Sequence, residues 1–193
     1  MAQIIILNGP PGCGKDTLAN WLWNNCYVDE VKSFKEPMFE IAKVVLGSRF
    51  DNFMALYNDR QTKEQPIEWL NGKSPREFLI FISEDFVKPC TSKMQFGILV
   101  AEGMPVSEEC VVMSDGGFPD EVLALADHEV DGRKHTIHLV RLHRHGFDFS
   151  KDSRDHIHFS PGPDNVHQYD ITLSNGQIES DAMRIANETG LIE

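Results

Sequence analysis

The sequence QIIILNGPPGCGKDT at residues 3–17 decides the expected fold of this chain. Residues 3–7 form a short β-branched run that ends at the turn NGPPG, as expected of a strand buried on both faces. Apolar residues continue from Lys15 to about Asn25 and predict a helix, although their spacing is only loosely amphipathic. A buried strand, a tight loop and a helix in this order indicate an α/β protein with this strand at the centre of a parallel sheet.

The loop at residues 9–17 matches the phosphate-binding pattern GxxxxGK. Its glycines let consecutive backbone N–H groups face a phosphate, and the start of the helix adds positive potential. Lys15 supplies a mobile positive charge, and Thr17 supplies a hydroxyl. A glycine-rich turn that only joins the strand to the helix is the alternative interpretation. The residues expected to bind ATP in this loop are Gly9, Gly12, Cys13, Gly14, Lys15, Asp16 and Thr17.

Two carboxylates are candidates for a metal site. Asp16 stands where many such loops have a Ser or Thr that binds Mg²⁺, so we expect the ion to be held through water or by another carboxylate. Asp115 follows the expected core strand at residues 110–113, at the end of the sheet where ligand sites collect. Asp115 could instead cap the helix that starts near Phe118.

Other segments repeat the alternation of strands and helices. Strands are expected at residues 31–34, 110–113, 135–142 and 169–173, and helices after Pro37, at 121–126 and around 178–187. Residues 51–104 are expected to be helical, with Ser74 and Glu77 forming a capping box around Pro75. The pattern predicts a three-layer α/β/α fold with a five-stranded parallel sheet.

Composition limits the classes of partner. The chain has 193 residues and a net charge of −12, so neither a nucleic acid nor an anionic membrane is an expected partner. Its four widely spaced cysteines form no CxxC pair and fit a reducing cytoplasm. Because the longest apolar run near the start is only four residues, we expect neither a signal peptide nor a membrane span there.

The segment 133–158 is positive within this acidic chain, with six basic and three acidic residues. Arg141, Arg144 and Arg154 fall in it, and arginines that converge on a transferred phosphoryl group suit a mobile lid. For any one of them, a surface salt bridge is the plainer interpretation. Six of the eight histidines lie between residues 135 and 158, but without a nearby cysteine or a clear third ligand a zinc site is a weak alternative.

Together these motifs resemble the phage deoxynucleoside monophosphate kinases, a family within the P-loop nucleoside monophosphate kinase superfamily. The resemblance covers nearly the whole chain, and its segments are GKDT at 14–17, SFKEP at 33–37, SPRE at 74–77, DGGFPDE at 115–121, DSR at 152–154, YD at 169–170 and NG at 175–176. It differs at Gly117, where the family pattern has an arginine, so the positive charge expected there would come from Arg141 or Arg60, or the acceptor would differ.

The resemblance implies a single P-loop kinase domain in which a helical acceptor-binding region at about 34–104 and a lid at about 143–160 close over the substrates. It implies transfer of the γ-phosphoryl group of ATP, with Mg²⁺, to a deoxynucleoside 5′-monophosphate in the host cytoplasm. Lys15, Arg141, Arg144, Arg154 and Asp115 would then be catalytic. Arg76 would grip the acceptor phosphate, unless it is a surface residue of its helix, and a homodimer follows from the resemblance alone. The further acceptor-binding residues would be Phe34, Lys35 and Arg60.

Two other classes of function stay open. The first is a kinase for another small phosphate ester, such as phosphomevalonate or dephospho-coenzyme A, whose enzymes share the core. The second is an ATP-binding regulatory protein that transfers no phosphate, although such a protein has little use for a positive lid. A polynucleotide kinase is disfavoured by the net charge of −12.

Overall fold

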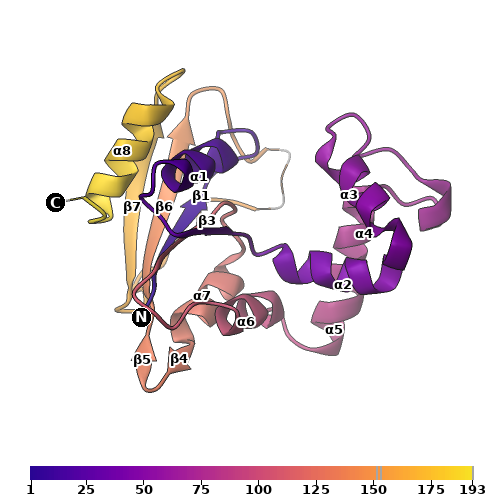
Figure 1. Cartoon of the computed structure of the whole chain (residues 1–193), viewed down its shortest axis with the longest axis horizontal. Coiled ribbons are helices and arrows are strands. Elements are labelled where there is room, and N and C mark those ends of the chain that lie inside the picture. Colours follow the sequence, from indigo (N-terminus) through magenta and orange to yellow (C-terminus); the bar gives the residue numbers. More distant parts are fainter. Residues whose placement is uncertain (151, 153, 193) are drawn as a thin grey trace. The chain divides into compact units, whose positions relative to one another are not determined.

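The computed structural model of the chain describes residues 1–150, 152 and 154–192. The chain divides into two compact units (Figure 1). Unit 1 comprises Met1–Phe34 and Gly97–Glu193, and unit 2 comprises Lys35–Phe96. The helical region expected at about 34–104 thus contains all of unit 2 and extends past its end into unit 1.

Unit 1 is built on a five-stranded sheet in the order β2-β3-β1-β6-β7. All four strand pairings are parallel, and Ile5 of the central strand is in register with Val112 on one side and His138 on the other. Five of the six residues of the central strand are buried, as its apolar run predicts. The expected parallel sheet with the first strand at its centre is therefore confirmed. The strands are β1 (Gln3–Asn8), β2 (Glu30–Lys32), β3 (Cys110–Met113), β6 (Thr136–Arg144) and β7 (Val166–Leu173).

Helices cover both faces of this sheet. Residues of α1 (Lys15–Asn24) and α8 (Ile178–Glu188) pack with Ile5 and Leu7 on one face. Residues of α6 (Gln95–Glu102) and α7 (Pro119–Asp127) pack with Ile4 and Ile6 on the other. Alternate residues of β1 thus supply two separate apolar clusters, because successive side chains of a strand point to opposite faces. This arrangement is a helix layer on each side of a sheet.

A small hairpin follows α7 and was not anticipated. Its strands, β4 (Glu129–Val130) and β5 (Arg133–Lys134), pair antiparallel. Asp131 and Gly132 connect them with φ values of 53° and 72°. Two positive φ angles in a two-residue hairpin loop are typical of an Asp-Gly sequence.

Unit 2 is helical, as expected for this part of the chain. Its capping box is confirmed, since the Glu77 N–H donates to Ser74 Oγ at 3.2 Å and the Ser74 N–H donates to Glu77 Oε2 at 2.7 Å. Phe53 is fully buried and meets the ring of Phe78 edge-on at 5.6 Å, so aromatic packing joins α3 to α4. The elements of unit 2 are α2 (Glu36–Leu46), η1 (Gly47–Arg49), α3 (Phe50–Asn58), η2 (Glu68–Leu70), α4 (Pro75–Ile80), the π-helix η3 (Phe81–Val87) and α5 (Lys88–Cys90).

Within the described ranges, no helix has both the length and the apolar character that crossing a membrane would require.

Candidate functional site

The loop between β1 and α1 has the backbone that its glycines predict. Gly12 and Gly14 have φ values of 76° and 111°, a conformation that side chains disfavour. A Cβ on Gly9 would lie 3.0 Å from the carbonyl oxygen of Leu142, so this position also needs glycine. Gly14 is the N-cap of α1 and provides no capping side chain. The first turn of α1 therefore begins directly at the loop, with Lys15, Asp16 and Thr17 on it.

Lys15 lies against the carbonyl groups of its own loop. Its Nζ donates to the carbonyl oxygens of Gly9 and Pro10 at 2.7 and 2.8 Å. The same Nζ is 3.9 Å from the Sγ atom of Cys13, which is fully buried. Burial raises the pKa of the Cys13 thiol despite the nearby charges of Lys15 and Arg144, so the thiol is neutral near pH 7. Two carbonyl groups of the loop thus hold the Lys15 ammonium group close to the loop backbone.

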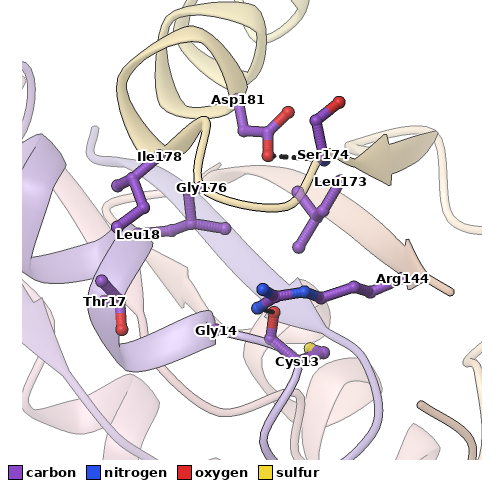
Figure 2. A pocket seen from close by; sticks show the side chains of 10 residues that line it. All are labelled: Cys13, Gly14, Thr17, Leu18, Arg144, Leu173, Ser174, Gly176, Ile178 and Asp181. Atoms are coloured by element: carbon purple, nitrogen blue, oxygen red, sulfur yellow. Dashed lines mark hydrogen bonds between the residues drawn. The ribbon is translucent and has the colours of Figure 1, made fainter. Parts of the chain in front are cut away.

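A pocket of about 160 Å³ adjoins this loop (Figure 2). Figure 2 shows Arg144 extending from the end of β6 across the pocket toward Cys13 and Gly14. The lining combines apolar side chains with the loop, the start of α1 and the turn between β7 and α8. The residues that line it are Cys13, Gly14, Thr17, Leu18, Arg144, Leu173, Ser174, Gly176, Ile178 and Asp181.

Arg144 connects the two sides of this pocket. Its Nη1 donates to the Cys13 carbonyl oxygen at 3.0 Å, and its Nε donates to Asn175 Oδ1 at 3.1 Å. Its guanidinium carbon lies 5.1 Å from the centroid of the Phe147 ring, within the range of a cation–π contact. The structure therefore brings this predicted residue to the glycine-rich loop.

Arg141 is placed differently, although it is only three residues away. It is 6% exposed, and its Nε and Nη2 donate to the two carboxylate oxygens of Asp170 at 2.9 and 2.6 Å. Its Nη1 donates to the carbonyl oxygen of Ile157 at 3.1 Å and to Gln168 Oε1 at 2.9 Å. These contacts hold the pKa of Asp170 well below its usual range, with His143 adding to the effect. The guanidinium joins β6, β7 and the segment before β7, which favours a structural role.

Arg154, the third candidate of the lid, makes an ion pair within its own segment. Its Nε and Nη2 donate to Asp152 Oδ1 and Oδ2 at 2.8 and 2.7 Å. Lys151 and Ser153, which belong to the positive segment and to the DSR motif, lie outside the described residues. The segment returns to the sheet at Ile157, whose N–H donates to Asn8 Oδ1 at 2.9 Å at the end of β1.

Asp115 anchors the segment that follows β2. The residue is 5% exposed, and its carboxylate accepts the Phe34 N–H at 2.8 Å and the Ser33 hydroxyl at 2.9 Å. Glu121 Oε2 accepts the N–H of Phe118, the N-cap residue of α7, at 2.8 Å, so Glu121 contributes to the cap of this helix. Asp115 therefore positions the start of the expected acceptor segment.

Gly117, where the family pattern has an arginine, is tightly packed. Its φ is 60°, and a Cβ there would lie 2.7 Å from Cδ2 of the buried Phe34 ring. Any larger residue would meet both backbone strain and a steric clash. The glycine thus belongs to the local packing of Phe34.

Three candidate acceptor-binding residues belong to unit 2. Arg76 is in the first turn of α4, is exposed, and donates from Nη1 to Glu64 Oε1 at 3.2 Å. Lys35 is the N-cap of α2, and Arg60 is exposed after the end of α3. The positive charge of each of these residues could attract an anionic ligand. Because an exposed ion pair such as Arg76–Glu64 is weak, it does little to hold Arg76 in one position.

The histidine-rich segment forms contacts that the sequence did not reveal. The ring centroids of His143 and His156 lie 4.4 Å apart, and both residues line a second cavity of about 540 Å³. Among the residues that the structure describes, no group of three or more His, Cys, Asp or Glu side chains is arranged to hold a metal ion.

Two residues near the pocket were missed by the sequence analysis as site residues. Asn175 Oδ1 accepts from Arg144 Nε. Asp181 accepts the Ser174 N–H at 2.8 Å (Figure 2). In the sequence, the Asn175-Gly176 pair stood out only as one of the segments that resemble the family, and Asp181 had no signal beyond being an acidic residue in the first turn of a helix.

A scan against models of known protein families matches none of them. A search of curated proteins likewise finds no match.

Proposed function

We propose that this protein is an ATP-dependent kinase that transfers the γ-phosphoryl group to a deoxynucleoside 5′-monophosphate. The observation that carries the proposal is the meeting of the glycine-rich loop and Arg144 at one pocket, with Lys15 on the first turn of the helix that follows the loop. A loop of this backbone with a lysine at the start of a helix suits a polyphosphate. The adjoining pocket suits the nucleoside attached to that polyphosphate.

The pocket has the chemistry expected for a purine base. Leu18, Leu173 and Ile178 provide apolar walls, and the Arg144 guanidinium provides a flat cation that stacks on aromatic rings. Small-molecule sites commonly combine such apolar walls with few polar groups. We therefore assign this pocket to the adenine of ATP.

Lys15 is the residue proposed to bind the transferred phosphoryl group. Its Nζ already lies at the loop, where two carbonyl oxygens at 2.7 and 2.8 Å hold it. Exchange of these neutral acceptors for phosphate oxygens would give stronger, charge-assisted hydrogen bonds. Arg154 is proposed to neutralise charge that develops during transfer, since phosphoryl transfer depends on positioning and electrostatic stabilisation.

Arg141 has no part in this proposed chemistry. Its donors bind Asp170, Gln168 and the Ile157 carbonyl group, and moving it to a phosphate would leave a buried region without its cation. Its role is to fix the strands that carry Arg144.

A magnesium ion would fit Asp16 better than Asp115. Asp16 is exposed on the first turn of α1, whereas both oxygens of the buried Asp115 accept hydrogen bonds from Ser33 and Phe34. When bound, Mg²⁺ offsets the negative charge of the phosphate oxygens.

Asp115 is instead proposed to hold the segment Ser33–Phe34 in place for the acceptor. Arg76 is proposed to bind the acceptor phosphate, because the fork of a guanidinium matches a phosphate dianion.

The proposal is tested by measuring ADP release with ATP and Mg²⁺ against the four deoxynucleoside monophosphates and the matching ribonucleotides. Phosphomevalonate and dephospho-coenzyme A serve as acceptors for the alternative class of kinase. We expect turnover on at least one deoxynucleotide and its loss in Lys15→Ala. Turnover only on another phosphate ester would reassign the substrate, and ATP binding without turnover on any acceptor would favour a regulatory protein.

A further inference from the structure

The turn between β7 and α8 forms one wall of the pocket beside the glycine-rich loop. Gly176 gives it a φ of 74°, and the Gln177 N–H donates to the Ser174 carbonyl oxygen at 3.3 Å. Residues 174–177 are exposed, so the turn has little apolar packing of its own. Its position must therefore depend on hydrogen bonds to residues outside it.

One of these hydrogen bonds comes from α8. Asp181 is 4% exposed, and its Oδ2 accepts the Ser174 N–H at 2.8 Å. Its other oxygen, Oδ1, accepts from Arg184 Nη2 at 3.1 Å, and the same guanidinium also donates to the Thr172 carbonyl oxygen. The carboxylate is thus oriented by one residue of its own helix and fixes the first residue of the turn.

The second hydrogen bond crosses the pocket. Asn175 Oδ1 accepts from Arg144 Nε at 3.1 Å, while Arg144 Nη1 donates to the Cys13 carbonyl oxygen at 3.0 Å. Arg144 therefore has one fixed contact on the turn and one on the phosphate-binding loop. A guanidinium held at two ends keeps its plane in one orientation, which a single contact would not achieve.

We infer that Asn175 and Asp181 are positioning residues that orient Arg144 and the turn as the base-binding wall of the nucleotide pocket. This inference rests on the proposed function, and it adds that different residues of the site determine the binding of the polyphosphate and of the base. The glycine-rich loop and Lys15 hold the polyphosphate, whereas the affinity for the base depends on Asn175 and Asp181. Neither of these two residues needs to touch the phosphates.

If the two sets of residues act separately, substitutions at Asn175 and Asp181 should change the binding of ATP but not that of inorganic tripolyphosphate. Asn175→Ala removes the acceptor that orients Arg144, so we expect about tenfold weaker binding of ATP, because a hydrogen bond to a charged donor is lost. Binding of tripolyphosphate should change by less than about twofold, since the loop is intact. Asp181→Asn should act in the same direction, because it replaces a charged acceptor of the Ser174 N–H with a neutral one.

The test measures equilibrium binding of both probes by calorimetry to the full chain. Asn175→Asp keeps the acceptor oxygen for Arg144 and should restore most of the ATP affinity. Asn187→Ala is the matched control. Asn187 is exposed on α8, the helix that carries Asp181, and this variant should bind both probes normally. Unfolding midpoints of all variants establish that they are folded.

Each outcome is decisive. Selective weakening of ATP in Asn175→Ala, with rescue in Asn175→Asp, supports the inference. Equal weakening of both probes, or no change in either, overturns it while leaving the proposed function standing. A wild-type protein that binds neither probe overturns the proposed function itself, and the inference with it.

Discussion

Arg144 Nη1 donates to the main-chain carbonyl oxygen of Cys13 at 3.0 Å, so the end of β6 is joined to the glycine-rich loop. The residues are 131 positions apart in the sequence. The contact places a guanidinium at the pocket, which would reduce the ordering that the proposed binding of a nucleotide must impose.

Arg144→Ala should weaken ATP binding without unfolding the protein. Loss of the stacking cation and of its charge should raise the KM for ATP about 10- to 30-fold, which corresponds to about 1.4–2 kcal/mol. The free energy of unfolding should change by less than about 1 kcal/mol, because the side chain is partly exposed. Steady-state kinetics and urea unfolding measure the two quantities. An unaltered KM would remove Arg144 from the proposed site.

Arg141→Met should show the opposite pattern. It leaves Gln168 and the Ile157 carbonyl group without their shared donor, so the free energy of unfolding should fall by about 2–4 kcal/mol. The KM for ATP of the folded fraction should change little. Urea unfolding of Arg141→Met beside Arg144→Ala makes the comparison, and a stable but inactive Arg141→Met would return Arg141 to the catalytic group.

The Arg141 variant should also lose part of the pH dependence of stability. Arg141 lowers the pKa of Asp170, so the stability from this pair is present above the usual Asp pKa near 3.8 and is lost as pH falls toward the lower value in the folded state. The difference in stability between the wild type and Arg141→Met should therefore shrink below about pH 4. A difference that is constant from pH 7 to pH 3 would show that the ion pair is not its source.

Restoring the arginine of the family pattern should harm this protein. Gly117→Arg imposes a side chain at a φ of 60° with its Cβ 2.7 Å from the Phe34 ring. We expect the free energy of unfolding to fall by about 2–4 kcal/mol from strain and clash together. Gly117→Ala is the control, since it has the same Cβ without the charge and should lose a similar amount. Full stability in Gly117→Arg, with tighter acceptor binding, would contradict this account of the position.

Buried histidines should make the protein sensitive to mild acid. His135 is fully buried, and neither of its ring nitrogens has a hydrogen-bond partner among the described residues. Burial lowers its pKa, and burial together with His167 lowers the pKa of His138 to about 4. Since the unfolded chain binds these protons more readily, the stability from neutral histidine is present above about pH 6.5 and is lost as pH falls toward 4.

His135→Leu should reduce this loss of stability between pH 7 and pH 5 by about 1 kcal/mol. The exposed His145→Leu is the matched control and should leave the slope unchanged. Urea unfolding at both pH values gives the slope. An unchanged slope in His135→Leu would assign the acid sensitivity to other groups.

Local signals were enough to predict the elements that position the site. The apolar run of β1, the glycines of the loop and the capping box around Pro75 each depend on neighbouring residues, and all appear where expected. The hairpin at β4–β5 was missed although the Asp131-Gly132 pair is its sequence signal. β7 begins at Val166, three residues earlier than expected, because His167 and Gln168 interrupt the apolar pattern.

The roles of individual charges were harder to predict, because they depend on pairing between distant segments. Arg141 and Arg144 look equivalent in the sequence, yet the first is in register with Asp170 in the neighbouring strand and the second reaches Cys13. Asp115 and Phe34 are 81 positions apart, so no local pattern indicates their hydrogen bond. Asn175 and Asp181 acquire a role only once the turn, α8 and Arg144 are folded around one pocket.

The central claim is that the chain transfers the γ-phosphoryl group of ATP to a nucleoside monophosphate. The most direct measurement incubates the protein with Mg²⁺, each deoxynucleoside monophosphate and ATP labelled at the γ-phosphorus, and follows the label by chromatography. The account predicts label in a deoxynucleoside diphosphate with the wild type and none with Lys15→Ala. Label that stays in ATP with every acceptor, or appears only as inorganic phosphate, would contradict it.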